Sequence, residues 1–89
     1  MRAAKIDSNQ SGIVAALRAI PGVTVAVGHD DIIVGRNGKS YWYEVKASEA
    51  SKRRNDLTAT EQRRFEREWQ GHYKIVCSLD EILKDMGIA

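Results

Sequence analysis

The first stretch of the chain has the spacing of an amphipathic helix. Apolar residues recur every three or four positions from Ile13 onward, which predicts a helix over 8–20. Asp7 and Gln10 stand three residues apart, as in a capping box at the start of a helix. Pro21 cannot continue a helix, so the helix is expected to end before it.

Four later runs are short, apolar and rich in β-branched or aromatic residues, which is typical of strands. They cover 23–27, 31–35, 40–46 and 73–77. Asn37 and Gly38 separate the second run from the third, and this dipeptide favours the two-residue turn of a β-hairpin. The second and third strands are therefore expected to pair antiparallel.

Two further helices are expected in the second half of the chain. Residues 47–57 are polar, charged and without periodicity, which predicts a loop. Thr58 then opens a helix with a capping-box residue three positions later, and Gly71 ends this helix. Ser78 and Glu81 repeat the capping-box spacing before a short final helix. The predicted order of elements is α-β-β-β-α-β-α.

The length and composition predict one small globular domain over residues 1–89. Hydrophobic residues make up 43% of the chain and charged residues 29%, which argues against disorder along its whole length. No apolar run approaches the roughly 20 residues that a membrane helix needs. The first residues lack the apolar block of a secretory signal, so we expect a cytoplasmic protein. The single cysteine, Cys77, excludes an internal disulfide and a zinc site with several cysteines.

The net charge is only +2, but the charges are unevenly distributed along the chain. Six basic and three acidic residues lie within 52–67. Such a stretch can bind phosphates, and it can equally be a solvated helix face with ion pairs three or four residues apart. The charge pattern alone favours neither interpretation.

The hairpin carries the sharpest prediction about chemistry. If Asn37 and Gly38 form the turn, paired residues have numbers that sum to 75, so Asp31 lies opposite Glu44. Directly opposed residues point to the same face of a sheet, with side chains roughly 5 Å apart. Lys46 is two residues beyond Glu44 and therefore shares that face.

Two directly opposed carboxylates repel each other, and burial would increase the cost of this repulsion. Lys46 could offset part of it. A divalent cation would offset more, and oxygen ligands of this kind suit Mg²⁺ or Mn²⁺. The backbone carbonyl of Val45 could add a further protein ligand. The alternative is an ordinary surface hairpin that carries Asp31, Glu44 and Lys46 on its solvent face without any ion.

The remaining candidate residues have simpler interpretations. Trp42 shares the face of Glu44, and we expect it to pack against the second helix rather than to stack on a base. Cys77 ends an apolar strand, and we expect a small buried hydrophobe rather than a nucleophile. His29 and His72 are expected in turns or loops.

Together, these motifs resemble those of the PD-(D/E)xK nuclease superfamily, and most of all its stand-alone, phage-type VRR-NUC domains. The resemblance runs over nearly the whole chain and is more specific in combination than in any one piece. Its parts are Asn9 and Gln10 with 13–18, the strand of Asp31, Glu44 with Lys46, Leu57 and Thr58 leading to Gln62, and 69–71. It implies a restriction-endonuclease-like α/β (α+β) core, in which helices flank a mixed sheet.

The resemblance also implies roles for individual residues. Asp31 and Glu44 match the two metal-binding carboxylates of the family. Lys46 matches its catalytic lysine. Gln62, on the second predicted helix, matches a glutamine that lies near the site.

The chain departs from the family pattern at two positions. Asp30 stands where the family usually has proline, and we expect this to affect only the shape of the turn. Gln10 stands where many members carry a glutamate on the first helix. Because glutamine adds no negative charge, we expect a site near Gln10 that holds one metal ion rather than two.

The resemblance implies a Mg²⁺- or Mn²⁺-dependent, structure-selective DNA endonuclease that hydrolyses phosphodiester bonds, with branched DNA such as four-way (Holliday) junctions as substrate. Cutting two strands needs two sites, so a two-fold homodimer is expected, in the cytoplasm of a bacterial or phage-infected cell. Lys52, Arg53 and Arg54 follow the catalytic strand and are expected to hold the DNA backbone.

Two other classes of function compete with the nuclease. A non-catalytic double-stranded nucleic-acid-binding module is the alternative, because the double-stranded RNA-binding domain also begins α-β-β-β-α and is basic. That domain presents lysines at the start of its second helix, whereas residues 58–61 carry no basic side chain. A third class is an interaction subunit without activity, and intact Asp31, Glu44 and Lys46 argue mildly against it.

Overall fold

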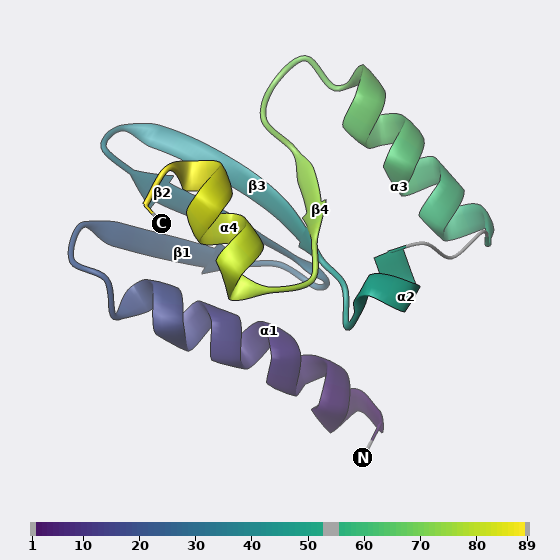
Figure 1. Ribbon diagram of the computed structural model, residues 1–89, viewed down its shortest axis with the longest axis horizontal. Helices are drawn as coiled ribbons and strands as arrows, with labels where there is room; N and C mark the ends of the chain where they lie inside the picture. Colours follow the sequence, from purple (N-terminus) through teal and green to yellow (C-terminus); the bar gives the residue numbers. More distant parts are fainter. Residues whose placement is uncertain (1, 53–55, 89) are drawn as a thin grey trace.

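The computed structural model describes residues 2–52 and 56–88, and of residues 2–8 it describes the backbone alone. It has a mixed α+β fold in which helices flank one four-stranded sheet (Figure 1). The helices are α1 (Arg2–Arg18), α2 (Glu49–Lys52), α3 (Leu57–Glu68) and α4 (Leu79–Met86). The strands are β1 (Val23–Val27), β2 (Asp31–Arg36), β3 (Lys39–Val45) and β4 (Lys74–Val76).

The sheet has the strand order β1-β2-β3-β4. The first three strands pair antiparallel, and β4 pairs parallel to β3. A parallel neighbour needs a long crossover connection, which the segment containing α2 and α3 provides. The predicted mixed sheet flanked by helices is confirmed.

The hairpin register agrees with the prediction at every pair. Arg36 pairs with Lys39 across the turn, and Asp31 pairs with Glu44. Asn37 and Gly38 have φ angles of 54° and 78°. Two successive residues with positive φ are the mark of the type I′ turn, whose twist matches that of the paired strands.

The hydrophobic core lies between the sheet and the helices α1 and α4, which cover the same face (Figure 1). Side chains from every strand point into it, because alternate residues of a strand share a face. The largest fully buried side chains are Tyr43, Leu17, Ile32, Ile82, Val34 and Val76. The hydroxyl of Tyr43 donates a 2.6 Å hydrogen bond to Asp85 at the end of α4.

The opposite face of the sheet carries an aromatic cluster that holds α3. The ring of Trp42 on β3 meets Phe65 and Trp69 of the α3 region edge to face, with centroids 5.4 and 5.7 Å away. It meets Tyr73, just before β4, at 4.9 Å. Such perpendicular contacts stabilise beyond simple burial. The prediction that Trp42 packs against the second long helix is confirmed.

The first helix was predicted too late in the chain. It begins at Arg2 and ends at Arg18, so Asp7 lies inside the helix rather than before its first turn. The periodic apolar residues begin at Ile13, in a part of the helix that packs on the core. Residues 2–5 are Arg, Ala, Ala and Lys, which favour helix without showing any apolar pattern.

The segment 47–57 is not an uninterrupted loop. The short helix α2 forms within it, because the hydroxyl of Ser48 accepts a 3.1 Å hydrogen bond from the backbone N–H of Ser51. Ser48 supplies this local cap without any apolar periodicity, which explains why the pattern predicted a loop.

The bounds of α3 also differ from those predicted. Its N-cap is Asp56, whose side chain accepts a 2.8 Å hydrogen bond from the backbone N–H of Ala59, so Thr58 lies inside the helix. The helix ends at Glu68 rather than at Gly71. The predicted cap of α4 is confirmed, since Ser78 accepts from the backbone N–H of Glu81. Among the described residues, no helix is long and apolar enough to cross a membrane.

Candidate metal centre

The candidate site lies at the end of the hairpin that is remote from its turn. Asp31 is the first residue of β2, and Glu44 is directly opposite on β3. Both side chains lie on the face that carries Trp42, because Glu44 is two residues beyond Trp42. Lys46 follows the last residue of β3, and its Nζ lies 3.7 Å from Glu44 Oε2. The structure thus brings the three predicted residues together.

Glu44 is the one buried charged residue in the described part of the chain, with 7% of its surface exposed. Its Oε2 atom has no hydrogen-bond partner. Burial raises the pKa of this carboxyl, and the charges of Asp30 and Asp31 add to the effect. Lys46 and a hydrogen bond with Gln62 act in the opposite direction. A cation bound at Glu44 would stabilise its charged form, so the residues fit a divalent metal ion.

Asp31 has a partner that the sequence did not predict. The indole Nε1 of Trp42 donates a 2.8 Å hydrogen bond to Asp31 Oδ2. The position of Trp42, two residues before Glu44 on the same face, is the only sequence signal for this contact. Trp42 therefore belongs both to the aromatic cluster under α3 and to the surroundings of the carboxylate pair.

Gln62 and Tyr73 border Glu44 from α3 and from the start of the β4 region. Together with Trp42 and Phe65 they line a cavity of about 560 Å³. The Oε1 atom of Gln62 is buried without a hydrogen-bond partner. Burial raises the pKa of the Tyr73 hydroxyl, and the nearby charge of Glu44 adds to this. Gln62 was predicted to lie near the site, whereas Tyr73 was missed because its approach depends on how the chain returns from α3.

The end of β3 is held from several sides. The backbone N–H of Val45 donates to the carbonyl of Asp30 at 3.0 Å. The carbonyl of Lys46 accepts a 2.9 Å hydrogen bond from Asn9 of α1. The Val45 side chain is buried in the core, so only its backbone can serve the carboxylate face. The role of the Val45 carbonyl as a metal ligand stays a prediction.

Asp30 supplies both a backbone carbonyl and a negative charge beside the site. Its carbonyl fixes Val45, and its negative charge acts on Glu44 more strongly than that of Asp31. A proline at position 30 would supply the carbonyl and no charge. This residue therefore increases the negative potential beside Glu44.

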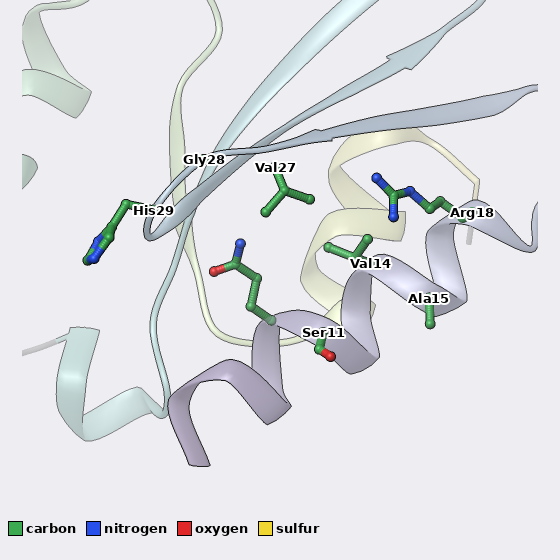
Figure 2. Close-up of a pocket in the computed structure, with 8 residues that line it drawn as sticks. Ser11, Val14, Ala15, Arg18, Val27, Gly28 and His29 are labelled. Carbon is green, nitrogen blue, oxygen red and sulfur yellow. The ribbon is translucent and has the colours of Figure 1, made fainter. Parts of the chain in front are cut away.

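A separate groove of about 390 Å³ lies between α1 and the end of β1 (Figure 2). Gln10 is one of the residues that line it. Val27 and Gly28 line the same groove, so Gln10 is beside the turn that precedes Asp31. No hydrogen bond joins Gln10 to either carboxylate within the described residues, and its role at the site stays a prediction. His29 points away from α1, as Figure 2 shows, and is the turn residue expected.

The basic residues predicted to hold DNA are described only in part. Lys52 forms ion pairs with Glu81 at 2.7 Å and with Glu49 at 3.5 Å. Arg53 and Arg54 lie outside the described residues. The ion pairs direct the Lys52 ammonium toward α4, and its contact with DNA stays a prediction.

Cys77 lies between the same two glutamates. Its Sγ is 3.1 Å from Glu49 Oε2, and burial together with hydrogen bonds to Glu49 and Glu81 raises the pKa of the thiol to about 12. The thiol therefore stays protonated at neutral pH, in keeping with the prediction that it is no nucleophile, but Cys77 is half-buried rather than fully buried as predicted. Glu49, Cys77 and Glu81 bring three possible ligand atoms within 4.8 Å of one another, and Lys52 supplies a positive charge to both carboxylates.

The atoms that converge at Asp31 and Glu44 are hard oxygen donors beside one ammonium group. This donor set suits Mg²⁺ or Mn²⁺ better than zinc, which takes nitrogen and sulfur ligands. Comparison of the chain with protein-family models, with curated proteins and with solved structures finds no match.

Proposed function

We propose that the chain is a metal-dependent DNA endonuclease with a restriction-endonuclease-like core, similar to the phage-type VRR-NUC domains. Its reaction is the hydrolysis of phosphodiester bonds in branched DNA such as four-way junctions. One observation carries the proposal: an oxygen of the buried Glu44 carboxylate, opposite Asp31, has no hydrogen bond and only the Lys46 ammonium 3.7 Å away. A surface hairpin without an ion would leave its opposed acids in solvent, whereas Glu44 is buried.

Asp31 and Glu44 would hold Mg²⁺ or Mn²⁺, with the Val45 carbonyl as a further ligand. The bound ion would neutralise charge on the scissile phosphate and make a water molecule more acidic. Lys46 lies within reach of Glu44 and would stabilise the extra negative charge that develops on the phosphate during attack. Gln62 hydrogen-bonds Glu44 and would keep its carboxylate turned toward the ion.

The partners follow from the same proposal. DNA would lie across the carboxylate face, with Lys52, Arg53 and Arg54 on its phosphates. Cutting both strands of a junction requires two sites, and two copies related by a two-fold axis would present one site to each strand. The enzyme would act in the cytoplasm of a bacterial or phage-infected cell.

Cleavage assays test this proposal on a four-way junction and on a duplex that shares its arm sequence, each with Mg²⁺, with Mn²⁺ and with a chelator. Glu44→Gln and Lys46→Ala are expected to lower the cleavage rate by at least about 100-fold. Glu68→Gln and Lys39→Ala change exposed residues of the same types and are expected to cleave normally.

Two results would count against the nuclease. Full activity in folded Glu44→Gln protein would remove this residue from the site. Salt-sensitive DNA binding by the unmodified protein, with no cleavage in either metal, would favour the non-catalytic nucleic-acid-binding module.

A further inference from the structure

Asp31 is held by a hydrogen bond from a side chain to which the proposed reaction assigns no role. The indole of Trp42 can only donate, and its Nε1 lies 2.8 Å from Asp31 Oδ2. A donor facing a carboxylate forms a charge-assisted hydrogen bond, which is stronger than one between neutral groups. Oδ2 is therefore committed to Trp42.

The direction of this N–H group is itself fixed. The ring of Trp42 packs against Phe65, Trp69 and Tyr73, each nearly perpendicular to it. A ring packed against three others cannot turn without losing these contacts. The packing of α3 against the sheet thus determines where the carboxylate of Asp31 can accept its hydrogen bond.

The second oxygen of Asp31 lies against Gly28. The backbone N–H of Gly28 donates to the carbonyl of Asp31 at 2.8 Å, which closes a tight turn. A Cβ atom at position 28 would overlap Asp31 Oδ1. At Gly12, by contrast, an added Cβ would meet open space. Position 28 therefore needs glycine, because the Asp31 carboxylate occupies the space that a side chain at this position would fill.

We propose that Trp42 and Gly28 are positioning residues that fix the Asp31 carboxylate in one orientation for a divalent cation. The inference rests on the proposed metal-dependent function. Trp42 occupies Oδ2, and the missing side chain at Gly28 makes room for Oδ1, whose lone pairs stay available to the ion. A ligand that is already oriented loses less freedom when the metal binds, so partners of this kind strengthen metal affinity.

The hydrogen bond can be observed without any metal. The chain has two tryptophans, so a ¹⁵N-labelled sample gives two indole N–H signals, which Trp69→Phe assigns. Asp31→Asn removes the charge of the acceptor and is expected to shift the Trp42 signal and to leave the Trp69 signal in place. A Trp42 signal that does not respond to Asp31→Asn would overturn the inference.

Metal affinity measures the consequence of the orientation. We expect Trp42→Phe, which keeps a ring in the cluster, and Gly28→Ala to weaken Mn²⁺ binding by about 10- to 100-fold in calorimetry or by electron paramagnetic resonance. Gly12→Ala is the matched control for Gly28→Ala and should bind Mn²⁺ as the unmodified protein does. Circular dichroism without metal identifies any variant that fails to fold.

The outcomes separate this inference from the proposed function. If the unmodified protein binds Mn²⁺ and folded Trp42→Phe and Gly28→Ala bind it equally tightly, the two residues do not position Asp31, while the nuclease proposal stands. If the unmodified protein binds no Mn²⁺ and cuts no DNA, the proposed function falls, and the inference falls with it.

Discussion

Glu44 is expected to make the protein less stable than it could be. Its carboxylate is buried, and burial raises its pKa although Lys46 lies 3.7 Å away and Gln62 supplies a hydrogen bond. A raised pKa of an acid means that the folded state favours the neutral form. Glu44→Gln, which has nearly the same shape and no charge, should therefore increase the free energy of unfolding at neutral pH.

The size of this increase follows from the unpartnered oxygen. A buried polar atom without a partner costs about 1–3 kcal/mol. Lys46 and Gln62 offset part of that cost at Glu44, so we expect a gain of about 1–2 kcal/mol in Glu44→Gln. In a domain of this size, each kcal/mol raises Tm by about 4–8 °C.

The pH dependence has a definite sign. Between the ordinary pKa of 4.5 and the raised pKa in the folded protein, the folded state binds more protons than the unfolded chain. The free energy of unfolding of the unmodified protein therefore falls as pH rises through this range. The advantage of Glu44→Gln is expected to be absent at lower pH and complete above the raised pKa.

Denaturant unfolding followed by circular dichroism, in a chelator at several pH values, measures this advantage. Glu68→Gln is the matched control at an exposed position and should leave stability unchanged. Added Mg²⁺ should stabilise the unmodified protein and not Glu44→Gln, because a ligand of the folded state stabilises it by mass action. The reasoning is refuted if Glu44→Gln is no more stable than the unmodified protein near pH 8, or if its advantage is the same near pH 4.

Three further predictions concern other parts of the molecule. Tyr43→Phe removes the donor to Asp85 and should lower the free energy of unfolding by about 1.5–3 kcal/mol at neutral pH in urea titrations. Burial alone would raise the pKa of Asp85, but its hydrogen bonds lower this pKa overall. The stability lost in Tyr43→Phe should therefore shrink as pH falls through the lowered pKa of Asp85. An equal loss of stability at every pH would contradict this prediction. Cys77 should react with a thiol reagent roughly a thousand times more slowly in the folded protein than in urea, because its pKa rises from 9.0 to about 12; similar rates would show an open thiol. Gly38→Ala should lower the free energy of unfolding by about 1–2 kcal/mol, because φ is 78° at this position. Gly12→Ala within α1 is the control and should cost no stability in the same urea titration. Equal losses of stability in the two variants would show that the turn does not require glycine at position 38.

The hairpin register could be predicted from sequence because it depends on local rules. Asn37 and Gly38 determine the turn type, and counting outward from the turn determines every pair up to Asp31 and Glu44. The same counting placed Lys46 on their face. No knowledge of the remaining fold is needed for these steps.

The surroundings of the carboxylates could not be predicted in this way. The contact of Trp42 with Asp31 and the approach of Tyr73 to Glu44 depend on how α3 docks on the sheet. Docking is decided by packing among residues far apart in the chain, and periodicity carries no information about it. The predicted start of α3 was wrong for a different reason. The cap at Asp56 is a local feature, but it lies in a polar segment without the periodic apolar pattern that would locate it in the sequence.

The turn at Asn37 and Gly38 links folding to the candidate site. It lies about 20 Å from Asp31, at roughly 3.4 Å for each residue of β2, and touches neither carboxylate. Adding or deleting one residue there would shift the pairing and turn every side chain of β3 to the other face. Glu44 would then enter the core and Tyr43 would leave it, so a slipped hairpin could not fold stably. A chain that folds at all has therefore already aligned its two carboxylates, and no separate selection on their alignment is needed.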